Sequence, residues 1–117
     1  YITYANEAKK SILGVRESTL TAFGAVSAQT AQEMALGAAE AAGSECSVVS
    51  TGIAGPGGGT TRKPVGLVYI ACCVNGNITV KEYHFQGSRS QIRNAAVEAA
   101  LELLEECIQS YLPEERE

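Results

Sequence analysis

Residues 65–85 are VGLVYIACCVNGNITVKEYHF. Two β-rich runs, 65–74 and 78–85, lie on either side of the pair Asn75-Gly76. A type I′ turn needs positive φ at both of its central residues, and Asn and Gly adopt that conformation most readily. The stretch therefore predicts an antiparallel hairpin.

A second strand is expected upstream of the hairpin, over residues 46–53, ending at Thr51-Gly52. It leads into the glycine-rich loop GPGGGT at residues 55–60. A P-loop would need lysine where Gly58 stands, and a dinucleotide fingerprint would need glycine where Thr60 stands. The loop therefore predicts neither a P-loop ATPase nor a Rossmann dinucleotide site.

The N-terminal part predicts a short strand and a helix. Residues 1–4 favour β structure, and Asn6 is a suitable N-cap for a helix that continues to residue 13 and ends at Gly14. Residues 15–26 are expected to form a connecting segment.

Two further helices follow from capping residues and apolar spacing. Ser27 and Thr30 are both possible caps for a helix to about residue 42, and Thr30 with Glu33 has capping-box spacing. Ser88 with Gln91 forms a second capping box, at the start of a long last helix. Small residues line one face of the first helix, so a sheet can approach it closely. The charged tail from Pro113 is expected to fray.

The order β-α-α-β-loop-β-β-α predicts an α/β fold: a three-layer-like mixed β-sheet that contains a β-hairpin and is flanked by helices. At 117 residues the chain is expected to form one domain over residues 1–117, truncated at its N-terminus.

Composition excludes several classes of site. Every acidic residue is glutamate, and His84 is the only histidine, so Ser-His-Asp triads and zinc sites with two histidines lack their parts. A net charge of −4 without a basic stripe argues against binding nucleic acid. No apolar run reaches the length of a membrane span. The cysteines have no CxxC spacing, and adjacent Cys72 and Cys73 are expected to be buried on opposite faces of a strand, which indicates a reducing, cytoplasmic location.

The glycine loop is the strongest candidate binding element. Glycines let the backbone approach a ligand and present N–H donors without obstruction. A loop at the carboxyl end of a strand would suit an anion. The alternative is a surface loop that only connects two strands.

At this loop the sequence resembles a known family. The run from Thr51 to Thr60 and the following KPVGLVYIA at residues 63–71 closely resemble the C-terminal domain of CinA, the nicotinamide-nucleotide amidases also described as competence/damage-inducible proteins. Collinear matches are TYANEAK at 3–9, LGV at 13–15, GAVS at 24–27, Met34-Ala35 with Gly37, and Gly87 with Arg89, Ile92 and Arg93. The resemblance covers nearly the whole chain.

The resemblance implies hydrolysis of the carboxamide of nicotinamide mononucleotide, giving nicotinate mononucleotide and ammonia, without metal or cofactor. The family nucleophile is a serine in a Glu-Ser-Cys-Thr-Gly-Gly motif that precedes the region of Tyr4. These residues do not contain that motif, so we assign no nucleophile and expect the chain alone to be inactive.

The other family positions can be transferred one at a time. Lys9 is expected to be the base that activates the serine, because a desolvated amine can accept a proton near neutral pH. Tyr4 is expected to relay a proton or orient the amide, and Thr51 to bond the carboxamide or its oxyanion. The alternatives are a solvated lysine, a core aromatic and a strand-end threonine.

Substrate binding is expected at the loop and at the last helix. The resemblance implies binding by Gly52, Gly55, Gly57 and Gly58, and by a phosphate contact from Arg89 or Arg93, which lie one helical turn apart. Their alternative role is that of surface arginines facing glutamates. His84 is expected to be an ordinary half-exposed strand residue.

The expected partners are a pyridine nucleotide and further copies of the chain, with no nucleic acid and no membrane. Two alternatives to the amidase remain open. One is a nucleotide-binding or regulatory module without catalysis, which the missing serine motif favours. The weaker one is a structural partner in DNA uptake or repair, which the acidic charge does not support.

Overall fold

The hairpin at Asn75-Gly76 is confirmed in the computed structural model, which describes residues 1–111. The φ angles are 52° at Asn75 and 85° at Gly76, as a type I′ turn requires. Val74 pairs with Asn77 beside the turn. The hairpin joins strands β2 (Leu67–Val74) and β3 (Asn77–His84).

Strand β1 (Cys46–Gly52) completes a sheet of order β1-β2-β3. It pairs antiparallel with β2, and β2 pairs antiparallel with β3. The α/β class and the hairpin are therefore as expected, but residues 1–111 contain no parallel strand pair, so the sheet is antiparallel and not mixed. Over the same residues, β1 is an edge strand.

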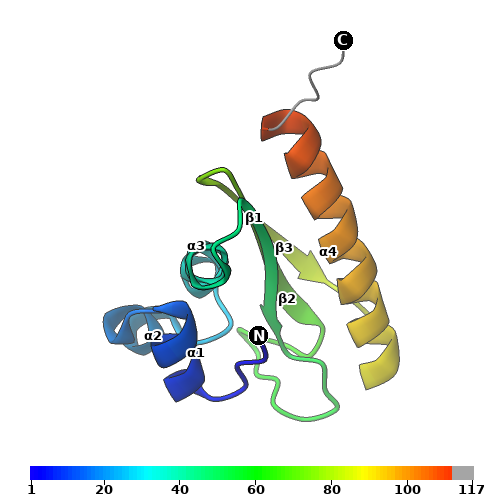
Figure 1. Ribbon diagram of the computed structural model, residues 1–117. Coiled ribbons are helices and arrows are strands. Elements are labelled where there is room, and N and C mark those ends of the chain that lie inside the picture. The colour runs from blue at the N-terminus through cyan, green and yellow to red at the C-terminus, as the bar shows by residue number, and fades with distance from the viewer. Residues whose placement is uncertain (112–117) are drawn as a thin grey trace.

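One face of the sheet is covered by α3 (Ala28–Ala42), and α1 (Asn6–Leu13) packs on α3 (Figure 1). Alanines 31, 35 and 39 of α3 are buried against Ala71 and Cys73 of β2. A Cβ atom at Gly37 would lie 1.6 Å from the carbonyl oxygen of Leu13. Small residues on α3 thus allow both the sheet and α1 to approach closely.

The opposite face is covered by α4 (Arg89–Tyr111), so the fold has three layers (Figure 1). Ile92, Leu103 and Cys107 of α4 are buried against Ile70 and Cys72. Cys72 and Cys73 are both buried and face different helices, as expected, and all four cysteines are free thiols. Both layers therefore pack on β2, the central strand.

The capping box at the start of α4 is confirmed. The backbone N–H of Ser88 donates to Oε1 of Gln91 at 2.8 Å, and the backbone N–H of Gln91 donates to Oγ of Ser88 at 3.2 Å. These bonds satisfy donors that the first helical turn leaves free. The two hydrogen bonds therefore fix the start of α4, where Arg89 lies.

Segment 15–26 is not merely a connection, because it contains helix α2 (Glu17–Phe23). The Glu33 carboxylate accepts hydrogen bonds from the backbone and side chain of Arg16 and from Thr19 Oγ1, at 2.6–3.1 Å. Glu33 therefore joins α2 to α3 and does not close a capping box with Thr30. Ser27 is the N-cap of α3, since its side chain accepts from the backbone N–H of Thr30.

The expected strand at residues 1–4 is wrong: this segment forms no regular secondary structure and pairs with no strand of the sheet. The predicted cap is also wrong, because Asn6 is the first residue of α1 and Ala5 is the N-cap, without a side-chain bond. β propensity alone does not make a strand when no neighbour supplies the ladder. The tail from Pro113 lies outside the described residues.

Candidate active site

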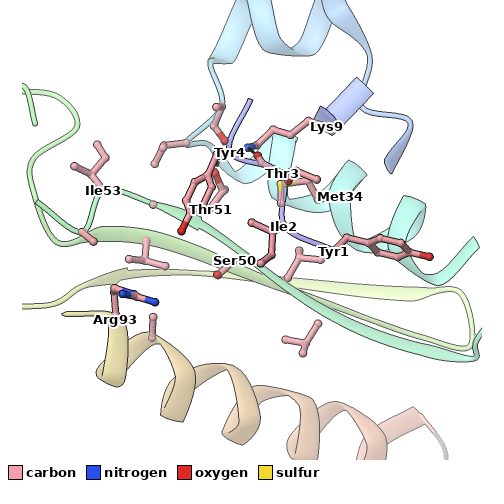
Figure 2. A pocket seen from close by; sticks show the side chains of 18 of the residues that line it. Tyr1, Ile2, Thr3, Tyr4, Lys9, Met34, Ser50, Thr51, Ile53 and Arg93 are labelled. Atoms are coloured by element: carbon pink, nitrogen blue, oxygen red, sulfur yellow. Dashed lines mark hydrogen bonds between the residues drawn. The ribbon is translucent and has the colours of Figure 1, made fainter. Parts of the chain in front are cut away.

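A cleft of about 860 Å³ opens beside the edge of β1 (Figure 2). Segment 1–4, α1 and α3 line it on one side of the strand, the start of α4 lines it on the other, and the glycine loop lines it at the end of β1. The sequence-predicted residues all line this cleft: Tyr4, Lys9, Thr51, Gly52, Gly55, Gly57, Gly58, Arg89 and Arg93. Residues from four separate parts of the chain thus meet around one space.

Lys9 is the buried titratable group of the cleft. It lies in the first turn of α1, and the residue is only 6% exposed. Its Nζ donates a hydrogen bond to the backbone carbonyl oxygen of Thr3. Burial removes water that would stabilise the ammonium form, which lowers the pKa of Lys9 below its ordinary value of 10.5.

The neighbouring lysine has the opposite environment. Lys10 Nζ lies 3.2 Å from Glu7 Oε2 and 3.4 Å from Glu17 Oε1. Hydrogen bonds with these carboxylates, Glu7 first, raise the pKa of Lys10. Lys9 and Lys10 are therefore adjacent on α1 but point in different directions. The Lys9 amine is desolvated in the cleft, and the Lys10 ammonium is paired with glutamates at the surface.

Tyr4 and Thr51 reach the cleft from opposite sides. Tyr4 is 84% exposed, and Figure 2 shows its ring directed across the cleft toward β1. Thr51 is buried at the end of β1, and its Oγ1 donates to the carbonyl oxygen of Ala25 at 2.7 Å. Since that bond uses its proton, Thr51 can offer a ligand an acceptor lone pair, which suits an amide N–H better than an oxyanion.

The glycine loop is held at its base and near its tip. The backbone N–H of Gly66 donates to the carbonyl of Ile53 at 2.7 Å, and that of Thr60 donates to the carbonyl of Lys63 at 2.8 Å. The Gly55-Pro56 peptide bond is cis. The two hydrogen bonds give the loop a defined conformation, so it is not merely slack chain between strands.

Gly57 differs from the other glycines of the chain. Each of the others has a positive φ or would place a Cβ within 3.0 Å of another atom. Gly57 has no positive φ, and no atom lies within 4 Å of its Cβ position. The fold does not require glycine there, and the bare backbone leaves room for a ligand to approach.

Arg89 and Arg93 differ in their contacts. Arg89 Nη1 donates to the carbonyl oxygen of Gly55 at 2.9 Å and so links α4 to the glycine loop. The side chain of Arg93, one turn further along, forms no hydrogen bond or ion pair with any residue from 1 to 111. Both arginines line the cleft, but only Arg89 has a hydrogen-bond partner for its side chain.

Sequence reasoning missed Ser50 and Thr3 as lining residues. Ser50 is exposed on β1 and also lines a second cavity of about 530 Å³ between β1 and α4, together with Arg93. Side chains alternate along a strand, so Ser50 lies on the face of the sheet opposite Thr51. This alternation could have identified Ser50 from the sequence. No sequence pattern pointed to the carbonyl of Thr3, because its role depends on how segment 1–4 folds back over α1.

The described residues hold no metal cluster and no membrane-spanning helix. Over residues 1–111, no three His, Cys, Asp or Glu side chains are grouped as metal ligands. None of the described helices is both long enough and apolar enough to cross a bilayer. His84 is exposed on β3, with Nε2 2.7 Å from Glu82 Oε2, and lies outside the cleft.

Comparison with known sequences gives a consistent match. Residues 1–108 match the CinA C-terminal domain. A protein named as competence-damage inducible from Clostridium acetobutylicum is 50% identical over 101 residues, which are 86% of this chain and 25% of that relative. A CinA-like protein from Kosmotoga olearia is 52% identical over 103 residues, which are 88% of this chain and 25% of its own length.

Solved structures agree. The competence/damage inducible protein CihA from Agrobacterium tumefaciens superposes with a TM-score of 0.86 at 50% identity, covering 89% of this chain and 64% of that chain. The competence damage-inducible protein A from Klebsiella pneumoniae gives 0.88 at 35% identity, covering 93% and 68%. The chain thus spans about a quarter of the length of these curated relatives and about two thirds of the length of these solved chains. By sequence and by fold, this chain belongs to the CinA C-terminal domain family.

Proposed function

We propose that this domain belongs to an amide hydrolase that deamidates nicotinamide mononucleotide, with Lys9 as the base and a serine supplied from outside these residues. The observation that carries the proposal is the burial of Lys9 in a cleft it shares with Thr51 and the glycine loop. A buried lysine without a carboxylate partner is costly unless its amine is neutral, and a neutral amine is a base.

In this mechanism Lys9 first accepts a proton from the serine and then donates it to the leaving group. The serine hydroxyl gives its proton to the amine while its oxygen attacks the carboxamide carbon. Breakdown of the tetrahedral intermediate cleaves the C–N bond, and the ammonium of Lys9 returns the proton so that ammonia leaves. Water then cleaves the serine ester by the same route, and nicotinate mononucleotide is released.

The remaining residues would orient the substrate. The lone pair of Thr51 Oγ1 would accept an N–H of the carboxamide, because its own proton is donated to Ala25. The Tyr4 hydroxyl would carry protons between the cleft and solvent. Gly52, Gly55, Gly57 and Gly58 would bind the substrate through backbone groups, and one of the two arginines, Arg89 or Arg93, would bind its anionic end.

The test is ammonia release from nicotinamide mononucleotide by the protein at its natural full length. The parent should release ammonia, EDTA should leave the rate unchanged, and Lys9→Ala should abolish most of it. No release by the parent, or equal release by Lys9→Ala, would refute the proposal.

A second function is a nucleotide-binding module without catalysis. One observation favours it: within residues 1–111, Lys9 Nζ has the Thr3 carbonyl as its hydrogen-bond partner and no serine hydroxyl. Binding of nicotinate mononucleotide without turnover by the full-length protein would support this module over the amidase.

The proposal also places the protein in the cytoplasm and includes self-association. Four free thiols suit a reducing cytoplasm, in which such cysteines stay unpaired. Within residues 1–111, the position of β1 at the edge of the sheet suits association between copies of the chain. Light scattering of the purified full-length protein would give its mass and so test self-association.

A further inference from the structure

Two arginines one turn apart on α4 have different environments. Arg89 Nη1 donates to the carbonyl oxygen of Gly55, 34 positions away in the sequence, at 2.9 Å. Arg93 makes no such bond to any residue of the described part of the chain. The two guanidinium groups therefore carry the same charge but are not equivalent in their contacts.

The contact of Arg89 fixes the first residue of the glycine loop. Gly55 is buried with φ of 82°, and a Cβ there would lie 2.6 Å from Cγ1 of Val65. The backbone of Gly55 thus lies close against Val65, and its carbonyl oxygen accepts the bond from Arg89. Without that bond the loop would keep its base at Ile53 and Gly66 but lose its tie to α4.

Arg93 lies where an anion could be reached from the cleft. It lines both the large cleft and the smaller cavity beside α4. Figure 2 shows Lys9 and Arg93 on opposite sides of β1, as expected from the packing of α1 on α3 and of α4 on the other face of the sheet. A ligand that reaches both must be elongated, with its amide at one end and its anion at the other.

Resting on the proposed function, we propose that Arg93 binds the phosphate of the substrate and sets the preference for a nucleotide over its nucleoside. Arg89 is a positioning residue that holds the glycine loop through Gly55. The free planar fork of Arg93 matches phosphate oxygens in pairs, whereas one N–H of Arg89 is committed to a carbonyl.

The experiment compares Arg93→Gln and Arg89→Gln on nicotinamide mononucleotide and on nicotinamide riboside, which lacks the phosphate. The protein is used at its natural full length, and each variant is first shown to keep the far-ultraviolet circular dichroism of the parent. Arg62→Gln is the matched control, because Arg62 is an exposed arginine between the glycine loop and β2 that does not line the cleft.

Arg93→Gln should raise KM for the mononucleotide by about tenfold or more and leave KM for the riboside unchanged. Arg93→Lys should restore part of the preference, since it keeps the charge. Arg89→Gln should lower kcat/KM for both substrates by the same factor, and Arg62→Gln should change neither. A substrate ratio that shifts as much in Arg89→Gln as in Arg93→Gln, or shifts in neither, would overturn the assignment.

If the parent turns over neither compound, the amidase proposal fails, and the arginine assignment is judged by calorimetry with ribose 5-phosphate. Binding by the parent that is lost in Arg93→Gln and is affected less in Arg89→Gln supports the assignment. No binding by the parent, or an equal or larger loss in Arg89→Gln, contradicts it.

Discussion

Lys9 Nζ donates a hydrogen bond to the backbone carbonyl of Thr3, and these residues are only 6% and 8% exposed. A carbonyl oxygen carries no formal charge, so it stabilises the ammonium form much less than a carboxylate would. A neutral amine can donate the same bond. The contact therefore holds the nitrogen in place without requiring it to be protonated.

Replacing this amine should remove catalysis and spare the fold. Lys9→Met keeps an unbranched side chain but has no basic nitrogen, so we expect the rate of ammonia release to fall by about 10²- to 10⁴-fold. The thermal midpoint should stay the same or rise, because a desolvated amine no longer has to be buried. Both are measured on the full-length protein.

Lys10→Met is the matched control for that experiment. It makes the same substitution at the next lysine, where Nζ pairs with Glu7 and Glu17 at the surface. Its ammonia release should equal that of the parent. Equal losses in the two variants would show that the charge of α1, and not the amine in the cleft, matters.

The lowered pKa of Lys9 also predicts a pH dependence of stability. Because the folded-state pKa lies below 10.5, the unfolded chain binds more protons between those two values, and stability rises with pH across that window. The difference in free energy of unfolding between the parent and Lys9→Met should therefore move in favour of the parent as pH approaches 10.5. Urea denaturation of both proteins measures it, and a pH-independent difference would contradict the shift.

Gly57→Ala should separate binding from folding. No atom lies within 4 Å of the new Cβ and φ is not positive, so stability should be unchanged or higher by about 0.4–1 kcal/mol. A methyl group facing a ligand should raise KM for nicotinamide mononucleotide by about tenfold. An unchanged KM would remove Gly57 from the site.

Gly59→Ala serves as the contrast. Its Cβ would lie 2.7 Å from the backbone nitrogen of Val65, so this variant should lower the thermal midpoint. Differential scanning calorimetry compares the two variants directly. A destabilised Gly57→Ala would show that the loop, and not a ligand, requires that glycine.

Glu33→Gln should loosen α2. Burial alone would raise the pKa of Glu33, but hydrogen bonds from Arg16 and Thr19 outweigh it, so the pKa lies below its ordinary value of 4.5. The variant should lose about 1–2 kcal/mol at neutral pH. Since the stabilisation is present above pH 4.5 and is lost as pH falls through the folded pKa, the loss should shrink at about pH 3. A loss equal at both pH values in urea denaturation would contradict this.

Local chemistry explains why some elements could be predicted. The Asn75-Gly76 turn and the Ser88 capping box depend on residues no more than three positions apart, and both are present. Helix α2 was missed because its stabilisation comes from Glu33, which is 14–17 positions away. Residues 1–4 have β propensity, but no strand of the sheet pairs with them.

The site shows the same division. The family motif identified residues that do line one cleft, but sequence could not distinguish Arg89 from Arg93, because the bond to Gly55 spans 34 positions. Nor could it show that the Thr51 proton is engaged by Ala25. Long-range contacts determine how each group can act, and they appear only when the chain is folded.

The most direct test of a desolvated, more readily deprotonated amine in the cleft is a titration of the lysine side chains by nuclear magnetic resonance. Lys9 should titrate below 10.5 and Lys10 above it in the same sample, because one amine is desolvated and the other is paired with carboxylates. A Lys9 that titrates at or above 10.5 would contradict the account, since its amine would then give up its proton no more readily than that of an ordinary lysine.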